Sequence, residues 1–404
     1  MKLCFVCSEY PPAIHGGIGS ATQTLARELV RLGHEVRVIG VYPSQQAGEP
    51  YRDDEGVRVY SLFEPPGRLG WLSARYQLFK TIRDWVREGL ADIVEVPDYR
   101  GWAAGWPKLP VPVVSRIHGS SSFIARETGQ KLDRISHFIE GWSLRRADSW
   151  CSVSQFAAQA TRSLFALRTD AAAVLYNPVP QAKEDVPFAD RERNSVVFAG
   201  SLTRIKGVEA LIKAWPMVLT SCPEARLQIY GKSGKSQSGQ SMREVLEHAV
   251  PTELKDTVFF HGRVERAVVL EAFSRARVAV FPSRSEAFGM VPLEAMSTGC
   301  PTVFSERATG PELIDHERDG LLVDPDSPQQ IAQAIVKLLR DDLYAAELGA
   351  AGRRKALEKF ELQKIVRENE RFFLQCIHRF DAARSVQDRR RNAAQINEDL
   401  VTKN

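Results

Sequence analysis

The sequence predicts an α/β protein with two doubly wound parallel-sheet domains that face each other across a cleft. Three observations lead to this prediction. Short apolar strands alternate with amphipathic helices along the 404 residues, which is the pattern of parallel sheets with right-handed crossovers. The alternation starts again after a polar stretch that follows Asn177 and Pro178. The length is sufficient for two cores, and ligands bind in the crevice at the carboxyl ends of such sheets.

The first half of the chain predicts a domain at residues 1–178. An apolar run forms the first strand, a glycine-bearing loop follows it, and Gly33 with His34 ends the first helix. We expect strands at residues 3–7, 35–41, 57–61, 93–96, 111–117, 149–153 and 173–175, and helices at residues 20–32, 75–88 and 135–146.

The second half predicts a linker at residues 179–194 and a second domain at residues 195–360. A charged helical segment at residues 361–404 follows, which we expect to cross back to the first domain. We expect strands at residues 195–199, 226–230, 258–260, 278–281, 302–304 and 321–323, and helices at residues 208–220, 242–249, 267–274, 292–297 and 328–340.

The composition narrows the class of protein. With 44% hydrophobic and 26% charged residues, the chain resembles ordinary soluble globular proteins. A net charge of +4 is far from the dense basic stripe of a nucleic-acid binder, although it suits anionic substrates. No apolar run reaches the roughly 20 residues that span a bilayer. The six cysteines are scattered, which predicts reduced thiols and a cytoplasmic protein.

The stretch S-E-A-F-G-M-V-P-L-E-A-M-S-T-G-C-P at residues 285–301 has the strongest chemical pattern. Glu286 lies on a loop after a predicted strand, and Glu294 lies eight residues later on a short helix. The bend between them presents backbone N–H groups just before a helix N-terminus, which attracts anionic oxygens. Two carboxylates beside it can accept hydrogen bonds from ribose and sugar hydroxyls. The residues alone leave open the alternative that Glu286 caps a loop and Glu294 is exposed on its helix.

This stretch resembles the glutamate-x7-glutamate signature of retaining glycosyltransferases of the "glycosyl transferases group 1" type. The resemblance covers nearly the whole chain, including residues 9–19, 116–119 and 200–207. It implies the GT-B fold, in which two Rossmann-like domains face each other. It also implies that Glu286 contacts the donor sugar and that Glu294 holds the nucleotide ribose. The backbone amides that would contact sugar and phosphate belong to Phe288, Gly289 and Met290.

The loop at residues 200–207 follows the first strand of the second domain. A glycine turn with Arg204 and Lys206 suits a diphosphate, because cations neutralise the charge that builds on the leaving group. Lys206 matches the diphosphate-binding lysine of the family. Family members usually have an arginine where this chain has Ser201, and we hypothesise that Arg204 supplies the missing guanidinium. The alternative is a solvated loop.

Two first-domain segments match the family on the other side of the cleft. Gly16 and Gly17 belong to an incomplete dinucleotide fingerprint, because Thr22 stands where a third glycine is needed, so NAD is not expected. As a family match, they let the backbone approach the donor phosphate. His118 ends a predicted strand and matches a histidine that touches the donor sugar near the reacting carbon. We expect it to position the donor and not to act as a base, and a core histidine is the alternative.

Four positions are further candidates. Asp98 and Arg100 follow another first-domain strand, on the domain where acceptors dock in this fold, and a loop cap is the alternative. Arg263 and Val264 match the place where family members hold the nucleobase, mainly through backbone atoms.

Two patterns imitate motifs without completing them. Residues 231–236 resemble a phosphate-binding loop, but Ile229 stands where the first glycine is required. Lys232 is still expected near the nucleotide, because its strand ends at the cleft. Asp324 and Asp326 spell a D-x-D metal pattern but lie between a strand and a helix, which predicts a turn. His34 and His137 have no other potential metal ligands near them in the sequence, so we assign no metal.

The predicted helix at residues 75–87 is basic, amphipathic and aromatic. Packing against its own sheet is the favoured interpretation. The alternative is a peripheral contact with the inner face of a membrane, which would suit an enzyme that acts on lipid-linked acceptors.

Together these observations predict a metal-independent retaining glycosyltransferase, hexosyl or related, that forms an α-linkage. Its expected partners are a nucleotide-diphosphate sugar and a glycan, lipid-linked or small-molecule acceptor, and nucleic acid is not expected. No cofactor is expected either, because the nucleotide sugar is a co-substrate. Rivals with the same fold are a glycan phosphorylase, which needs a pyridoxal-phosphate lysine, and a nucleotide-sugar epimerase. A rival of another class is a nucleotide-sugar-binding scaffold for envelope or polysaccharide assembly, which Ser201 prompts.

Overall fold

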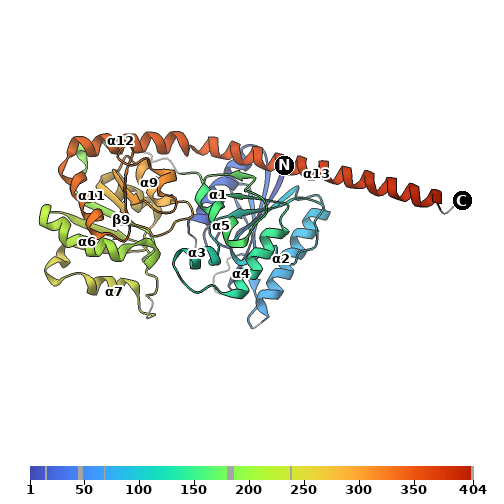
Figure 1. Ribbon diagram of the computed structural model, residues 1–404, viewed down its shortest axis with the longest axis horizontal. Coiled ribbons are helices and arrows are strands. Elements are labelled where there is room, and N and C mark those ends of the chain that lie inside the picture. Colours follow the sequence, from blue (N-terminus) through green and yellow to red (C-terminus); the bar gives the residue numbers. More distant parts are fainter. Residues whose placement is uncertain (14–15, 44–48, 68, 180–185, 237–238, 402–404) are drawn as a thin grey trace.

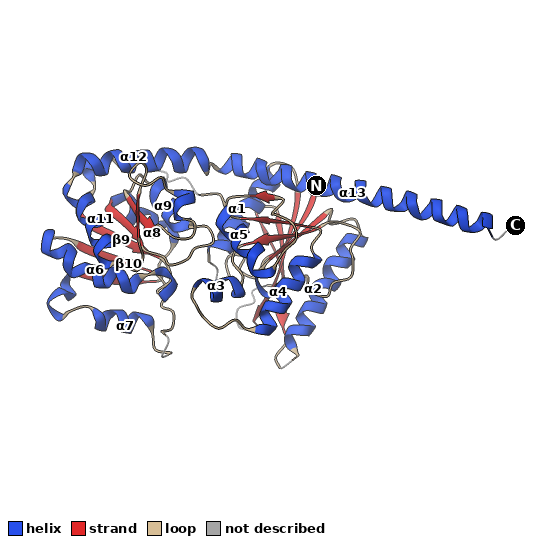
Figure 2. Ribbon diagram, in the orientation of Figure 1, coloured by secondary structure: helices blue, strands red, loops and turns tan. Residues whose placement is uncertain are grey.

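In a computed structural model, the chain forms two α/β domains side by side, with the C-terminal helices along one edge of both (Figure 1). The structure describes residues 1–13, 16–43, 49–67, 69–179, 186–236 and 239–401. Helices cover both faces of each sheet (Figure 2). The predicted pair of doubly wound α/β domains is confirmed.

The first domain contains an eight-stranded sheet in the order β3-β4-β2-β1-β5-β6-β7-β8. Its central strands β5 and β6 are buried at every residue, as expected where helices cover both faces. Its elements are β1 (Lys2–Val6), α1 (Gly17–Arg31), β2 (Glu35–Pro43), β3 (Tyr51–Asp54), β4 (Val57–Glu64), α2 (Gly70–Arg87), β5 (Ile93–Pro97), the 3₁₀ helix η1 (Tyr99–Gly101), β6 (Val113–Ile117), α3 (Ser121–Glu127), α4 (Arg134–Arg146), β7 (Ser149–Ser152), α5 (Gln155–Phe165) and β8 (Ala173–Val174).

The edge strand β3 differs from the prediction of purely parallel sheets. It runs antiparallel to β4, and the turn between them consists of Glu55 and Gly56, whose φ angles are 53° and 86°. A two-residue turn with two positive φ angles matches the twist of a hairpin. Because β3 is short and polar, the search for apolar runs missed it.

The second domain contains a six-stranded sheet in the order β11-β10-β9-β12-β13-β14, in which the described pairings are parallel. Its elements are η2 (Phe188–Asp190), β9 (Glu192–Ala199), η3 (Arg204–Lys206), α6 (Val208–Ser221), β10 (Arg226–Tyr230), α7 (Met242–Ala249), η4 (Thr252–Thr257), β11 (Val258–Gly262), α8 (Arg266–Arg275), β12 (Ala276–Phe281), α9 (Met290–Ser297), β13 (Thr302–Ser305), α10 (Gly310–Leu313), β14 (Leu321–Val323), α11 (Pro328–Arg340) and α12 (Asp342–Lys359).

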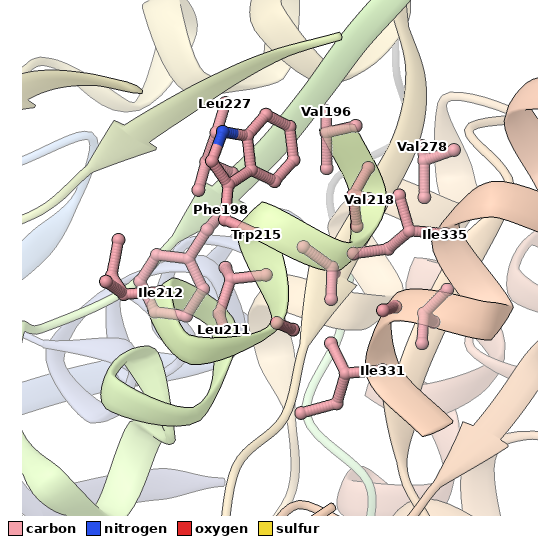
Figure 3. Close-up of a cluster of buried hydrophobic side chains, with 14 of the residues drawn as sticks. Val196, Phe198, Leu211, Ile212, Trp215, Val218, Leu227, Val278, Ile331 and Ile335 are labelled. Atoms are coloured by element: carbon pink, nitrogen blue, oxygen red, sulfur yellow. The ribbon is translucent and has the colours of Figure 1, made fainter. Parts of the chain in front are cut away.

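One core of the second domain lies between the sheet and the helices α6 and α11 (Figure 3). Trp215 of α6 lies in this core, and its indole N–H donates to Thr257 Oγ1 at 2.9 Å. Ile331 and Ile335 of α11 pack against the same cluster, four residues apart on one helix face. This packing holds β9 and β12, whose carboxyl ends carry the site.

The last helix, α13 (Leu362–Val401), returns to the first domain. Phe373 packs on Phe5 of β1 with ring centroids 5.8 Å apart, and Asn369 Oδ1 accepts from Arg116 of β6 at 2.6 Å. Figure 1 shows that α13 continues past the first domain and projects beyond it. Side chains from residue 387 on, including Arg389–Arg391, lie outside the described part.

The linker predicted at residues 179–194 overlaps the first elements of the second domain. The strand β9 already begins at Glu192, and η2 precedes it. Residues 180–185 lie outside the described part of the chain. None of the described helices is long and apolar enough to cross a membrane.

Candidate active site

The two sheets present their topological switch points to a common cleft. In the first sheet β1 lies between β2 and β5, and in the second β9 lies between β10 and β12. Loops on the two sides of a switch point diverge, and a crevice opens between them. A cleft of about 1340 Å³ lies between the domains, and both contribute to its lining. The residues that line this cleft and were predicted from the sequence as site residues are Gly17, His118, Arg204, Lys206, Glu286, Phe288, Gly289 and Met290.

A close backbone contact brings Lys206 to Glu286. Gly207 has φ 71°, and a Cβ at this position would lie 1.7 Å from the carbonyl oxygen of Pro282, so only glycine fits. The loops after β9 and β12 therefore touch. The ammonium group of Lys206 pairs with Glu286 Oε1, to which the hydroxyl of Ser283 also donates at 3.3 Å. A cation and a carboxylate thus stand side by side at the cleft.

The start of α9 forms the adjacent wall of the cleft. Gly289 caps the helix with φ 96°, and a Cβ there would lie 2.9 Å from Leu313 Cδ1. The backbone N–H groups of the first helical turn lack intrahelical partners and carry partial positive charge. Met290 and Val291 line the cleft at this turn. An anionic oxygen can therefore be bound here.

Glu294 lies one turn further along α9, on the same face as Met290. It is buried, and its carboxylate pairs with the guanidinium of Arg266 at the start of α8. Burial raises the pKa of Glu294, and Arg266 opposes this shift. Glu294 is not among the residues that line the cleft. Arg266 was not among the predicted residues, whereas Arg263 and Val264, a few positions earlier in the chain, were.

His118 reaches the cleft from the end of β6. Burial, followed by the charge of Arg116, lowers the pKa of His118 to about 3, so the imidazole is neutral near pH 7. Its backbone N–H donates to Asp98 Oδ1 at 2.9 Å, and the N–H of Gly119 donates to Asp98 Oδ2 at 3.1 Å. Asp98 itself is fully buried, and burial raises its pKa to about 7. Asp98 therefore holds the backbone of the His118 turn through two hydrogen bonds.

Direct contacts hold the two domains together beside the cleft. A Cβ on Gly17 would lie 3.4 Å from Met290 Cγ, an ordinary van der Waals distance, so the start of α1 lies next to the start of α9. The hydroxyl of Ser154 donates to the carbonyl oxygen of Ala287 at 2.6 Å. The carboxylate of Glu312 accepts from the N–H groups of residues 155 and 156 at 2.8 and 3.2 Å, at the N-terminus of α5. A carboxylate of one domain thus caps a helix of the other.

Several predicted residues lie away from the cleft lining. Gly16 donates its N–H to Glu9 Oε2 at 3.2 Å, one residue before the lining begins. Arg263 is exposed after β11, next to the half-buried Val264. Arg100 lies 3.4 Å from Glu64 at a separate pocket of the first domain.

Lys232 is exposed and does not line the cleft, while Lys235 does. After β10 the chain runs parallel to the loop that follows β9, because the N–H of Leu202 donates to the carbonyl oxygen of Lys232 and the N–H of Gly234 donates to that of Leu202, both at 2.9 Å. This backbone pairing carries the following residues along the loop of Ser201 to the cleft. Lys235 is the second lysine of the 231–236 stretch, and the repeated G-K-S spelling was the signal that could have identified it.

Three further cations that line the cleft were missed: Lys131 between α3 and α4, Lys213 of α6, and Arg284 of the loop after β12. Lys213 lies one helical turn beyond Glu209, another lining residue, so the spacing on α6 could have indicated it. Arg284 pairs with Asp326 at 2.8 Å.

The D-x-D pattern is occupied by guanidinium groups. Arg307 pairs with Asp324 at 2.6 Å and with Asp326 at 2.7 Å. Asp324 also accepts from the N–H of Asp326 at 3.0 Å, as in a turn. Among the described residues, no group of three or more His, Cys, Asp or Glu side chains could hold a metal ion.

Known proteins resemble both domains. Residues 16–178 match the family described as "Glycosyl transferase 4-like domain", and residues 193–341 match "Glycosyl transferases group 1". The chain is 29% identical over 390 residues to an uncharacterized glycosyltransferase of Methanocaldococcus jannaschii, covering 91% of this chain and 96% of that protein. It is 28% identical over 408 residues to a glycogen synthase of Mycobacterium tuberculosis, covering 93% and 94%.

Solved structures share the architecture. Sucrose-phosphate synthase from Thermosynechococcus elongatus has a TM-score of 0.77 at 20% identity, covering 92% of this chain and 98% of that one. The Anabaena protein HepE, in complex with UDP and glucose, has a TM-score of 0.68 at 18% identity, covering 92% and 99%. These similarities confirm the GT-B fold.

Proposed function

We propose that this chain, which is a glycosyltransferase of the GT-B type, transfers a sugar from a nucleotide-diphosphate sugar with retention and forms an α-linkage. The observation that carries the proposal is the Lys206–Glu286 pair beside the N-terminus of α9, opposite His118. A cation, a helix N-terminus and a carboxylate provide the three kinds of contact that a diphosphate next to a sugar ring requires.

The diphosphate would lie against the N-terminus of α9, with Lys206 and Arg204 around it. Charge builds on the β-phosphate as the bond to the sugar breaks, and preorganised cations and amides stabilise it. Lys235 and Lys213 add positive charge to the same cleft. We therefore propose that side chains carry out this neutralisation without a metal ion.

The donor sugar would contact Glu286, and the ribose would contact Glu294. A carboxylate accepts hydrogen bonds from two vicinal hydroxyls at once, which orients a ring. Burial raises the pKa of Glu294, and the ion pair with Arg266 favours its charged form against this effect. Glu286 pairs with Lys206, and donor binding would exchange this pair for a diphosphate–Lys206 contact and a sugar–Glu286 contact.

In the transfer step the bond between the anomeric carbon and the diphosphate oxygen breaks, and the acceptor oxygen bonds to that carbon from the same face. The acceptor proton passes to the departing diphosphate, which leaves as nucleoside diphosphate. His118 is neutral at pH 7 because its pKa is about 3, so it can donate or accept a hydrogen bond without changing its charge. We assign it to positioning the donor sugar near the reacting carbon.

The acceptor would be a glycan, a lipid-linked sugar or a small molecule that enters from the first domain. The candidate donor to try first is a UDP-sugar, because the similar Anabaena structure holds UDP and glucose. The test is to incubate the protein with UDP-, GDP- and ADP-sugars and to measure release of nucleoside diphosphate, with Lys206→Ala as the matched variant. Release by the wild type that Lys206→Ala lowers at least tenfold would support the proposal. Tight binding of a nucleotide sugar with no release under any condition would favour a scaffold, the reading that Ser201 prompts.

A further inference from the structure

The helices α2 and α4 expose a group of aromatic and aliphatic side chains on the first domain. On α4, Ile135, Phe138 and Trp142 follow one another at spacings of three and four residues and are between 45% and 68% exposed. The buried side chains of α4 lie on its other face, for example Leu144. The exposed members on α2 and just before it are Leu69, Trp71, Leu72 and Tyr76.

These two rows border a common pocket. A pocket of about 290 Å³ is lined by Trp71 and Arg75 of α2 and by Ser136 and Ile139 of α4. Figure 2 shows α2 and α4 next to each other on one side of the first domain. We call the exposed residues 69, 71, 72, 76, 135, 138 and 142 the α2–α4 surface. Soluble proteins rarely expose a contiguous apolar area of this kind unless it binds something.

Cations stand at the ends of both rows. On α4, Arg134 precedes the row and Arg145 follows Trp142 by three residues, and both arginines are exposed. On α2, Lys80 continues the four-residue spacing of Leu72 and Tyr76. Cations at the edges of an aromatic row can reach lipid phosphates while the rings remain at headgroup depth.

The carboxylates close to these rows are engaged. Asp133 caps α4 and accepts from the N–H of Ser136 at 3.1 Å. Asp84 of α2 pairs with Arg83 at 2.8 Å. Asp133 keeps its negative charge beside Arg134, and Arg83 and Asp84 cancel each other, so Arg134, Arg145 and Lys80 (+3) together with Asp133 (−1) leave a net charge of +2 around the α2–α4 surface.

The pocket between the helices contains two neighbouring guanidinium groups. Arg75 lies over the rings of Trp71 and Trp102, at 5.7 and 5.3 Å from their centroids, and Arg100 lies 5.5 Å from Trp102. Burial, and then the charge of Arg100, lowers the pKa of Arg75 to about 10, so Arg75 remains charged near pH 7. Two carboxylates also line the pocket, of which one pairs with Arg100 at 3.4 Å and the other accepts two backbone N–H groups of α3; they are Glu64 and Glu140.

We propose that the α2–α4 surface docks on a membrane that contains anionic phospholipid. The aromatic rings lie among the headgroups, and Arg134, Arg145 and Lys80 contact lipid phosphates. Aromatic side chains and cations on adjacent helices form the pattern by which proteins bind such surfaces without crossing them. This docking does not depend on the proposed function.

The position of α3 connects the α2–α4 surface with the cleft. Ser121 of α3 lines the pocket between α2 and α4, and Phe123 and Ile124 of the same helix line the cleft. One short helix therefore separates the two. A docked protein presents the first-domain side of its cleft close to the lipid headgroups, where a lipid-linked acceptor would be.

The test is flotation of the full chain with two kinds of vesicle, pure phosphatidylcholine and equal parts of phosphatidylcholine and phosphatidylglycerol. The first variant, Phe138→Ser with Trp142→Ser, removes the rings, and the second, Arg134→Glu with Arg145→Glu, reverses the flanking charges. The matched controls are Leu343→Ser on α12, which is 81% exposed, and the exposed Lys255→Glu, both on the second domain. Circular dichroism and nucleoside diphosphate binding are used to check that each variant is folded. Nucleotide binding should be unchanged, because none of the substituted residues lines the cleft.

We expect the wild type and both controls to float with the anionic vesicles and not with the neutral ones. Each cation near the surface contributes about fivefold to partitioning, so the charge-reversed variant loses about 25-fold or more. The ring variant also loses binding, and high salt weakens the wild type. Absence of wild-type binding to anionic vesicles would overturn the proposal, as would equal binding to both vesicles or variants that bind like the controls. A dimer that only the ring variant dissociates, with no vesicle binding, would assign the α2–α4 surface to a second copy of the chain and equally overturn it.

Discussion

The Lys206–Glu286 pair allows a test in which two neighbouring substitutions have opposite effects on nucleotide affinity. Nucleoside diphosphate contains the phosphates that Lys206 would bind but lacks the sugar that Glu286 would bind. In the free protein the two side chains pair with each other, with 25% and 17% of their side-chain surface exposed. Removing the lysine therefore removes a phosphate contact, whereas neutralising the glutamate releases the lysine for the phosphate.

The magnitude follows from the partial burial of the pair. A hydrogen bond to a charged group contributes about 1.5–3 kcal/mol. Because about 1.4 kcal/mol corresponds to a factor of ten, Lys206→Ala should weaken nucleoside diphosphate binding by about 10- to 150-fold. Glu286→Gln should leave this affinity unchanged or tighten it, and should lower kcat/KM for transfer by a similar 10- to 150-fold.

The assay is isothermal titration with nucleoside diphosphate together with turnover of the matching nucleotide sugar. Lys255→Ala, an exposed lysine outside the cleft lining, is the control for loss of one positive charge. Equal weakening of nucleoside diphosphate binding in Lys206→Ala and Glu286→Gln would refute the assignment of the two residues to different parts of the donor. Unchanged affinity in Lys206→Ala would refute the diphosphate contact itself.

Three further predictions concern the surroundings of this pair. Arg204→Ala should weaken nucleoside diphosphate binding by about tenfold if its guanidinium replaces the arginine absent at Ser201, and calorimetric affinity equal to the wild type would exclude that replacement. Asp98→Ala leaves two buried N–H groups without acceptors, so urea unfolding should show a loss of about 2–6 kcal/mol, and a loss below about 1 kcal/mol would contradict the positioning role. His118 has a pKa near 3 in the folded state, below its ordinary value near 6.5, so its contribution to stability is lost as pH falls from 6.5 to 3. Relative to the wild type, His118→Ala should show an acid-side slope reduced by up to about 1.4 kcal/mol per pH unit, and identical slopes would contradict a buried neutral imidazole.

Much of the fold could be predicted from the apolar runs in the sequence and the turn residues that separate them. Strands β10 and β14 and helices α7 and α11 have the predicted boundaries, because their apolar residues stop abruptly at polar or turn residues. The strand β3 and the short helix α3 were missed for the opposite reason. Four polar strand residues and seven helical residues carry too little periodicity to be recognised.

Candidate site residues could be predicted where the strand that precedes their loop ends at the cleft. Lys206 and Glu286 lie in the loops that follow β9 and β12, so their strands place both loops at the cleft, and the contact of Gly207 with Pro282 then brings the two side chains together. Lys232 and Lys235 show the limit, because the pairing of Gly234 with Leu202 decides which lysine reaches the cleft. The residues around Lys232 and Lys235 do not by themselves indicate this contact, because Leu202 lies about thirty residues earlier in the chain.

Buried partners explain the remaining differences. Asp98 was expected at the acceptor side, but two N–H groups of the His118 turn bind its carboxylate in the interior. Glu294 was expected at the ribose, and its ion pair with Arg266 depends on how α8 packs against α9. These arrangements depend on tertiary packing, which a single sequence does not specify.

The most direct test of the proposed retaining transfer is the configuration of the first product formed from an α-linked nucleotide sugar. Slow transfer to water needs no acceptor, and proton NMR distinguishes the α- from the β-sugar before the two interconvert. Retention predicts that the α-anomer accumulates first and that Lys206→Ala slows its appearance. The β-anomer as the first product would contradict the account.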